Sequence, residues 1–115
     1  MLDFSRSAET QPLLIVDDDE PFRNRLARAM EKRGFAVTTA ASVAEGCDVA
    51  RRDKPTYAVL DLRLEDGSGL EIVKELQGSQ PEARIIVLTG YGNIAPAVAA
   101  VKAGAIDYLP KPADA

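Results

Sequence analysis

The sequence predicts an α/β fold in which short buried strands alternate with amphipathic helices. Apolar runs at 13–16, 57–60 and 85–88 are continuous and not alternating, which is typical of strands buried on both faces of a sheet. Weaker runs at 35–39 and 108–109 supply two further strands. Because helical patterns separate all of these runs, we expect a five-stranded parallel sheet joined by right-handed crossovers.

The predicted helices have recognisable first and last turns. The first has Pro21 in its first turn, the second and third open with the capping-box patterns Ser42–Glu45 and Ser68–Glu71, and the fourth ends at Gly104. Their apolar residues recur every three or four positions, as in helices that pack one face on a sheet. The side chains predicted to face inward are Phe22, Leu26, Ala29, Met30, Val43, Cys47, Ala50, Leu70, Val73, Leu76, Ile94, Ala97, Val98 and Val101.

Composition excludes several functions. The 115 residues are enough for one domain, and the net charge of −4 gives no support for broad nucleic-acid binding. The chain has no histidine, which excludes Ser-His and Cys-His catalysis, imidazole zinc sites and a role as phosphohistidine donor. A single cysteine, Cys47, forms no intramolecular disulfide and fits a cytoplasmic location. No targeting segment or membrane span is predicted, because the longest uncharged stretch, 85–101, is broken by glycine and proline.

Acidic residues follow two of the predicted strands directly. Asp17, Asp18 and Asp19 come after the first strand, and Asp61 comes after the third. Carboxyl ends of parallel strands meet at one edge of the sheet, where such folds place ligands. Clustered carboxylates repel unless a cation joins them, so we expect a Mg²⁺ site. The alternative is that the acids only cap the following helix, and it remains open for Asp19 and Glu20.

Two more strand ends add polar groups to the same edge. Thr89 and Gly90 follow the fourth strand, and Lys111 follows the fifth. Each of them alone is an ordinary surface residue. Together with acids and a metal, a hydroxyl and an ammonium are what a phosphoryl group on a carboxylate requires.

At this point the sequence resembles the receiver domains of two-component response regulators. The motifs are Leu-Ile-Val-Asp-Asp-Asp at 14–19, Val-Leu-Asp-Leu at 59–62, Val-Leu-Thr-Gly at 87–90 and Asp-Tyr-Leu-Pro-Lys-Pro at 107–112. They occur in the family's order and spacing, and the match covers about residues 12–112. The resemblance implies a flavodoxin-like (CheY-like) doubly wound sheet with strand order 2-1-3-4-5.

The resemblance also implies roles for the acidic residues. Asp61 is then the phosphoacceptor, which takes a phosphoryl group from a phosphohistidine of a sensor histidine kinase. Asp17 and Asp18, with Asp61 and the backbone carbonyl of Arg63, would hold Mg²⁺. The side chains of Arg63 and Tyr91 line the approach to the site and would tune the lifetime of the phosphoryl group.

The remaining family positions imply a conformational switch. Thr89 is the hydroxyl that bonds the phosphoryl oxygen, and Lys111 is the lysine that pairs with it. Tyr108 is the aromatic residue that changes rotamer when Thr89 moves, while Gly90 leaves the phosphoryl group accessible. The domain would therefore be a switch and not a turnover enzyme, because it promotes only its own phosphorylation and dephosphorylation.

Three segments resemble one branch of the family, the redox-responsive RegA/PrrA/ActR transcriptional regulators of proteobacteria. They are residues 63–69, 89–92 and 111–115. We expect a flexible arm at 1–11 and a receiver domain at 12–115 that stops before the family's last helix and before a DNA-binding helix-turn-helix domain. DNA would be contacted only through that absent domain.

Two other functions are possible on an α/β fold, and each requires residues that this sequence lacks. An aspartate-nucleophile, Mg²⁺-dependent phosphatase would need a second acid two positions after Asp61, where this chain has Arg63. A flavodoxin would need a phosphate-binding loop after the first strand, where the run Asp17–Asp19 would repel phosphate. A missing last helix would also leave apolar sheet surface beside Tyr108–Leu109, so we expect self-association, as a homodimer or with exchange of elements.

Overall fold

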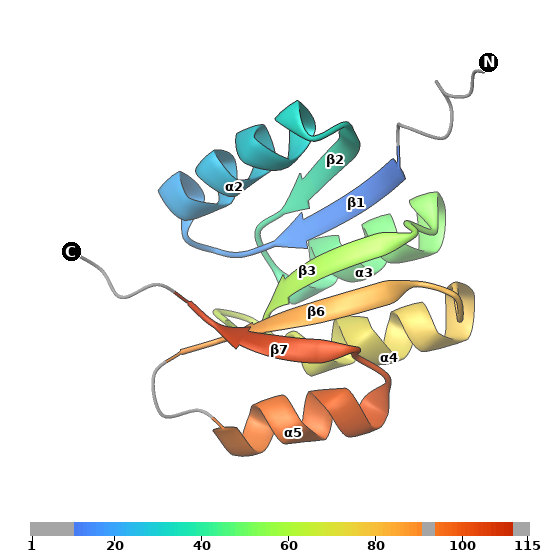
Figure 1. Cartoon of the computed structure of the whole chain (residues 1–115). Helices are drawn as coiled ribbons and strands as arrows, with labels where there is room; N and C mark the ends of the chain where they lie inside the picture. The colour runs from blue at the N-terminus through green and yellow to red at the C-terminus, as the bar shows by residue number, and fades with distance from the viewer. Residues whose placement is uncertain (1–10, 91–93, 112–115) are drawn as a thin grey trace.

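The computed structural model describes residues 11–90 and 94–111 (Figure 1). Strands and helices alternate along it as the sequence predicts. The elements are β1 (Gln11–Val16), α2 (Glu20–Lys32), β2 (Phe35–Ala40), α3 (Val43–Asp53), β3 (Tyr57–Asp61), β4 (Arg63–Leu64), β5 (Gly67–Ser68), α4 (Leu70–Ser79), β6 (Arg84–Thr89), α5 (Ile94–Ala103) and β7 (Asp107–Pro110).

The main sheet has the order β2-β1-β3-β6-β7, and every neighbouring pair in it is parallel. This confirms the predicted order 2-1-3-4-5, because β4 and β5 form a separate two-stranded antiparallel sheet. Each strand of this small hairpin has only two residues, which is too short to leave a periodic pattern in the sequence. The hairpin was therefore not predicted.

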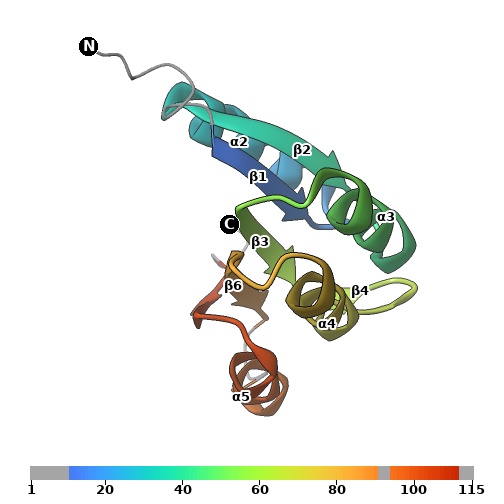
Figure 2. The same cartoon turned by 90° about the vertical axis from the view of Figure 1, so that its right-hand side faces the viewer.

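Helices cover the two faces of the sheet unequally (Figures 1 and 2). On one face α3, α4 and α5 pack over a continuous core. The largest fully buried side chains of this core come from three strands and one helix: Leu14, Val16, Leu60, Ile72, Val73, Leu76, Ile85 and Val87. Burial of each such side chain stabilises the fold by about 1.5–3 kcal/mol. Packing on this face therefore fixes the position of β1 and β3, the strands that carry the acids.

On the other face, α2 lies over β1 and β2 (Figure 1). Its Ala27 packs with Leu13 and Ile15 in a small second cluster. Over β3, β6 and β7 no helix from the described residues covers this face, and a hollow of about 300 Å³ opens there. We call it the open face; its lining includes Met30, Phe35, Tyr57, Val59, Ile86 and Ile106.

Helix ends confirm one capping prediction and correct another. Ser42 caps α3, because its hydroxyl accepts from the Glu45 amide at 3.1 Å. The second predicted box is wrong: α4 begins at Leu70 after Gly69, and that cap makes no side-chain hydrogen bond. Ser68 belongs to β5, where its hydroxyl accepts from the Leu70 amide at 3.1 Å. The hairpin takes up the residue that the pattern assigned to the helix.

Two predicted inward positions are also wrong, because Ala29 of α2 and Val98 of α5 are exposed. In α5 the buried residues are Ala97 and Ala100, whose small side chains permit close packing. That helix is apolar on all sides, so its composition does not mark which side faces the sheet. Its predicted end is confirmed, since Gly104 adopts φ +130°, a conformation that favours glycine.

Candidate functional site

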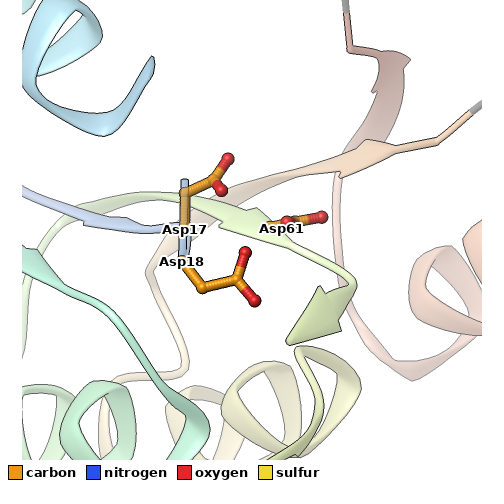
Figure 3. Close-up of side chains that lie close together, drawn as sticks. All are labelled: Asp17, Asp18 and Asp61. Atoms are coloured by element: carbon orange, nitrogen blue, oxygen red, sulfur yellow. The ribbon is translucent and has the colours of Figure 1, made fainter. Parts of the chain in front are cut away.

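The predicted acids come together at the carboxyl ends of β1 and β3 (Figure 3). Parallel pairing sets Val16 beside Leu60, so Asp17 and Asp61, which follow them, lie at the same level of the sheet. One carboxylate oxygen from each of Asp17, Asp18 and Asp61 lies within 4.8 Å of the others. These three residues are the only such group of potential metal ligands in the part of the chain that the structure describes.

Asp17 is fixed in place by backbone contacts. Its side chain is fully buried, and its amide donates to the Ala40 carbonyl at 3.1 Å. The Asp17 Oδ1 atom accepts from the Asp19 amide at 2.9 Å, while Arg23 Nη1 donates to the Asp17 carbonyl at 3.0 Å. The acid is therefore oriented before any ligand binds, and Arg23 is a supporting residue that sequence reasoning missed.

Asp19 has the other role that was considered for these acids. It is the N-cap of α2, and its Oδ1 accepts from the Phe22 amide at 3.2 Å. The capping alternative is therefore confirmed for Asp19, whereas Asp17 and Asp18 join the metal-ligand group. Neighbouring aspartates thus divide between helix capping and the acidic site.

Lys111 enters the acidic site from the end of β7. Its Nζ lies 3.0 Å from Asp17 Oδ2 and 3.5 Å from Asp61 Oδ2. The same Nζ lies 5.1 Å from the centre of the Phe22 ring, a cation–π contact not anticipated from the sequence. The Lys111 amide donates to the carbonyl of buried Thr89 at 2.8 Å, so the residues bearing the ammonium and the hydroxyl are joined through their backbones.

The electrostatics of the site are unbalanced. Burial, reinforced by the charge of Asp17, raises the pKa of Asp61 to about 6, although the Arg63 amide and Lys111 oppose the shift. Burial alone would lower the pKa of Lys111, but its hydrogen bond to Asp17 and the charges of Asp61 and Asp17 outweigh that effect and raise it. The group therefore has three carboxylates but one ammonium, which contacts only two of them, Asp17 and Asp61, and the site favours an added cation.

The donor set fits Mg²⁺. Carboxylate oxygens are hard ligands, and this ion is held by one or two of them while it keeps several waters. Asp17, Asp18 and Asp61 would hold it, and the Arg63 carbonyl, two positions beyond Asp61, is the further predicted ligand. The Arg63 amide already donates to Asp61 Oδ1 at 3.3 Å, so this segment and the acid are in contact.

Close packing fixes the backbone behind Asp61. The Leu62 amide donates to the Leu88 carbonyl at 3.2 Å, and the Gly69 amide donates to the Leu62 carbonyl at 3.0 Å. A β-carbon at Gly69 would overlap the carbonyl oxygen of Asp61. Only glycine allows the start of α4 to approach this strand end so closely.

The other predicted site residues have different surroundings. Arg63 and Gly90 line a hollow of about 210 Å³ together with residues of the hairpin and α5. Tyr108 is half-buried on the edge strand β7 and packs against the main core. Tyr91 lies outside the described residues. Asp66, whose carboxylate caps α3 from the hairpin, was not singled out from the sequence.

Comparison with known proteins agrees with this geometry. The chain belongs to the response regulator receiver domain family, whose match covers residues 13–115. It is therefore a phosphoacceptor signalling domain of two-component systems, and the match favours this class over a phosphatase. No helix among the described residues has the length and hydropathy needed to cross a membrane.

The similar proteins include regulators of the photosynthetic apparatus and of acid tolerance. The chain is 67% identical over 103 residues to the photosynthetic apparatus regulatory protein RegA of Cereibacter sphaeroides, covering 90% of this chain and 56% of that protein. It is 64% identical over 103 residues to the acid tolerance regulatory protein ActR of Rhizobium meliloti, covering 90% of this chain and 53% of that protein. The chain thus spans about half the length of the curated relatives it matches.

Solved structures confirm the CheY-like fold. A receiver domain protein (CheY-like) from Methanospirillum hungatei superposes with a TM-score of 0.84 at 30% identity, over 91% of this chain and 84% of that one. A response regulator from Burkholderia pseudomallei superposes with a TM-score of 0.83 at 46% identity, over 90% of this chain and 61% of that one. The latter structure contains a phosphorylated aspartic acid and a calcium ion.

Proposed function

We propose that Asp61 is the residue that receives the phosphoryl group, from a phosphohistidine of a sensor histidine kinase. The observation that carries this proposal is the position of the Asp61 carboxylate, which lies beside Asp17 and Asp18 and within 3.5 Å of the Lys111 ammonium. An oxygen of Asp61 attacks phosphorus, the P–N bond breaks, and its electron pair returns to the imidazole of the kinase. The product is an acyl phosphate.

The surrounding residues make this attack feasible. A carboxylate approaches an anionic phosphoryl group only if the charge between them is neutralised. Mg²⁺ held by Asp17, Asp18 and Asp61 would supply part of that neutralisation. Lys111 would supply the rest, because its ammonium contacts both Asp17 and Asp61. Asp17 and Asp18 hold the metal and take no part in bond formation.

Phosphorylation would then move the edge of the sheet. The acyl phosphate adds about two negative charges and new acceptor oxygens. Thr89 and Lys111 are joined by the hydrogen bond between their backbones, so a hydroxyl and an ammonium that turn toward the phosphoryl group move together. On β7, Tyr108 pairs with Val87, two positions before Thr89 on the neighbouring strand β6. It would change rotamer as Thr89 moves. Gly90 would leave the phosphoryl group accessible, and the side chains of Arg63 and Tyr91 would tune the rate of phosphate loss.

A small phosphodonor such as acetyl phosphate, added with Mg²⁺, tests the assignment. Intact mass is expected to show one added phosphate on the wild-type chain, none on Asp61→Asn and none with a chelator. Asp48→Asn, which alters an exposed acid of α3, is the matched control and labels like the wild type. Equal labelling of Asp61→Asn and wild type would overturn the site.

The relatives are named as regulators of the photosynthetic apparatus and of acid tolerance, and the chain matches only about half of their length. We propose that the receiver controls transcription through a DNA-binding domain in the cytoplasm, in response to a redox signal. Of the arm predicted at 1–11, Gln11 is the first residue of β1, and the rest lies outside the described residues. The domain would turn over no external substrate.

The chain by itself would also self-associate through the open face, with a second copy of the same chain as occupant. Ile106 and Leu109 are 50% and 49% exposed, and Phe35 and Tyr57 add aromatic surface in edge contact at 5.4 Å. An apolar patch of this kind, bordering on an edge strand, is buried most simply by a two-fold pairing of identical patches.

Sedimentation measures that association. Ile106→Lys is expected to shift the chain to monomer, whereas Val98→Lys changes an exposed apolar residue of α5, on the other side of the sheet, and leaves association unchanged. A wild-type chain that is monomeric at high concentration would contradict the pairing, and so would equal effects of both substitutions.

A further inference from the structure

Asp66 connects two segments that are distant in sequence. It lies in the turn of the β4–β5 hairpin, and its Oδ1 accepts from the Val43 amide at 2.8 Å while Oδ2 accepts from the Ala44 amide at 3.1 Å. These are the first amides of α3, which have no acceptor within their own helix. One carboxylate therefore holds the hairpin against the start of α3 with two hydrogen bonds to a helix N-terminus.

Both ends of this connection lead to the acidic site. On the hairpin side, β4 starts at Arg63, and its pairing with Ser68 makes one short rigid unit of the residues between them. On the helix side, Val43 follows closely after Ala40, whose carbonyl accepts from the Asp17 amide at 3.1 Å. Asp66 thus links the segment that bears Arg63 to the segment that fixes Asp17.

Residues other than Asp66 also cap the start of α3. Ser42 already accepts from the Glu45 amide, and Glu45 Oε1 accepts from the Ala41 amide at 2.9 Å. These two contacts are local in sequence, and neither reaches the hairpin. What Asp66 adds is the long-range connection, across 23 and 22 residues.

We propose that Asp66 is a positioning residue of the phosphorylation site, which holds the Arg63 carbonyl in register with the metal-binding carboxylates. This role rests on the proposed function, because it requires a metal at Asp17, Asp18 and Asp61. Asp66 touches neither metal nor phosphoryl group. Its loss lets the hairpin move away from α3, and the metal keeps its carboxylate ligands but loses a well-placed carbonyl.

Mg²⁺ titration of the 115-residue chain by calorimetry tests the role, with Asp66→Ala compared with Ser42→Ala. Both variants remove capping interactions from α3, and each such loss costs about 1 kcal/mol of stability. Only Asp66→Ala releases the hairpin, so we expect Mg²⁺ binding about fivefold weaker in that variant and within about twofold of wild type in Ser42→Ala, since residues that orient metal ligands change affinity by this order or more.

Two further variants complete the experiment. Asp66→Asn keeps one acceptor oxygen and is expected to lie between Asp66→Ala and wild type, and it carries the test if Asp66→Ala does not fold. Glu65→Ala, an exposed neighbour in the same turn, is expected to bind like wild type. Phosphorylation by acetyl phosphate slows in Asp66→Ala at limiting Mg²⁺ and recovers at saturating Mg²⁺.

The outcomes that overturn the role are distinct from those that overturn the site. Equal weakening in Asp66→Ala and Ser42→Ala, or unchanged binding in both Asp66 variants, leaves Asp66 as a helix cap only and refutes the positioning role. Mg²⁺ binding that survives unchanged in Asp61→Asn would instead refute the metal site, and with it any role of Asp66 toward it.

Discussion

The two halves of the site sit on unequal parts of the sheet. Asp17 and Asp61 end the central strands β1 and β3, which pair on both sides, and Asp17 is fully buried. Lys111 follows β7, the last strand of the described sheet, where Leu109 is 49% exposed. The acids are therefore preorganised, while the lysine belongs to an element at the less stable end of the fold. We call the ends of β1 and β3, with their acids, the rigid half of the site, and the end of β7, with Lys111, its edge half.

The largest expected effect comes from breaking the rigid half at Gly69. Gly69 has φ −59° and ψ −16°, which any residue adopts, so Gly69→Ala acts only through the overlap of its β-carbon with the Asp61 carbonyl. We expect a loss of about 3 kcal/mol in unfolding free energy, as for other overpacked sites, together with slower phosphorylation. Urea denaturation measures the first and intact mass the second.

Gly78→Ala is the matched control for that substitution, because it lies in the same helix and its β-carbon meets nothing within 4 Å. There the exchange of glycine for alanine is expected to stabilise the chain by about 0.5–1 kcal/mol. A Gly69→Ala chain as stable as wild type would show that the end of β3 yields readily, and the contrast between the two halves would not hold.

A smaller effect is expected in the pH dependence of the stability of the metal-free protein, which tests the environment of Asp61 in the rigid half. The pKa of Asp61 rises from 3.8 to about 6 on folding, so the folded state binds this proton more tightly than the unfolded state. Its contribution to the unfolding free energy is fully present below about pH 4 and is lost as the pH rises through about 6. Thermal unfolding in a chelator across this range is expected to show the loss in wild type and a flatter curve in Asp61→Asn.

Added Mg²⁺ provides the internal control for this measurement. It binds the ionised carboxylates, so it is expected to stabilise the wild-type chain most at neutral pH and to have little effect on Asp61→Asn. If the two metal-free chains had the same pH profile of stability, the pKa of Asp61 would not be raised by folding.

The rigid half was predictable from sequence and the hairpin was not, for a physical reason. Continuous apolar runs that end in Asp17 and Asp61 give both the strand and the position of the acid at its end, so the acidic edge follows from a local pattern. Asp66 binds amides 23 and 22 residues away, and no spacing within its own segment indicates that contact. Long-range hydrogen bonds of this kind have no periodic signature.

The prediction of which helix residues face the sheet was wrong where the helix has a uniform composition. In α4 the predicted inward residues Val73 and Leu76 are fully buried, because the charged residues between them mark the outer side, but the equally buried Ile72 was missed. In α5, alanine and valine occupy nearly every position, and the prediction placed Val98 inward although it is 38% exposed. Thr89, the proposed switch residue, was found because it ends its strand, whereas the contact of the Phe22 ring with Lys111 could be found only in the structure.

The smallest expected effect concerns that ring. Phe22 lies 5.1 Å from Lys111 Nζ and is the only aromatic ring that contacts this ammonium among the residues described. Phe22→Leu keeps an apolar side chain and removes the ring, which costs about 0.5–1 kcal/mol of attraction for the ammonium. If the edge half is held this weakly, the variant is expected to phosphorylate at a wild-type rate while the Lys111 side chain becomes measurably more mobile by NMR relaxation. A change in the mobility of buried Asp17 instead would mean that the two halves are mechanically one unit.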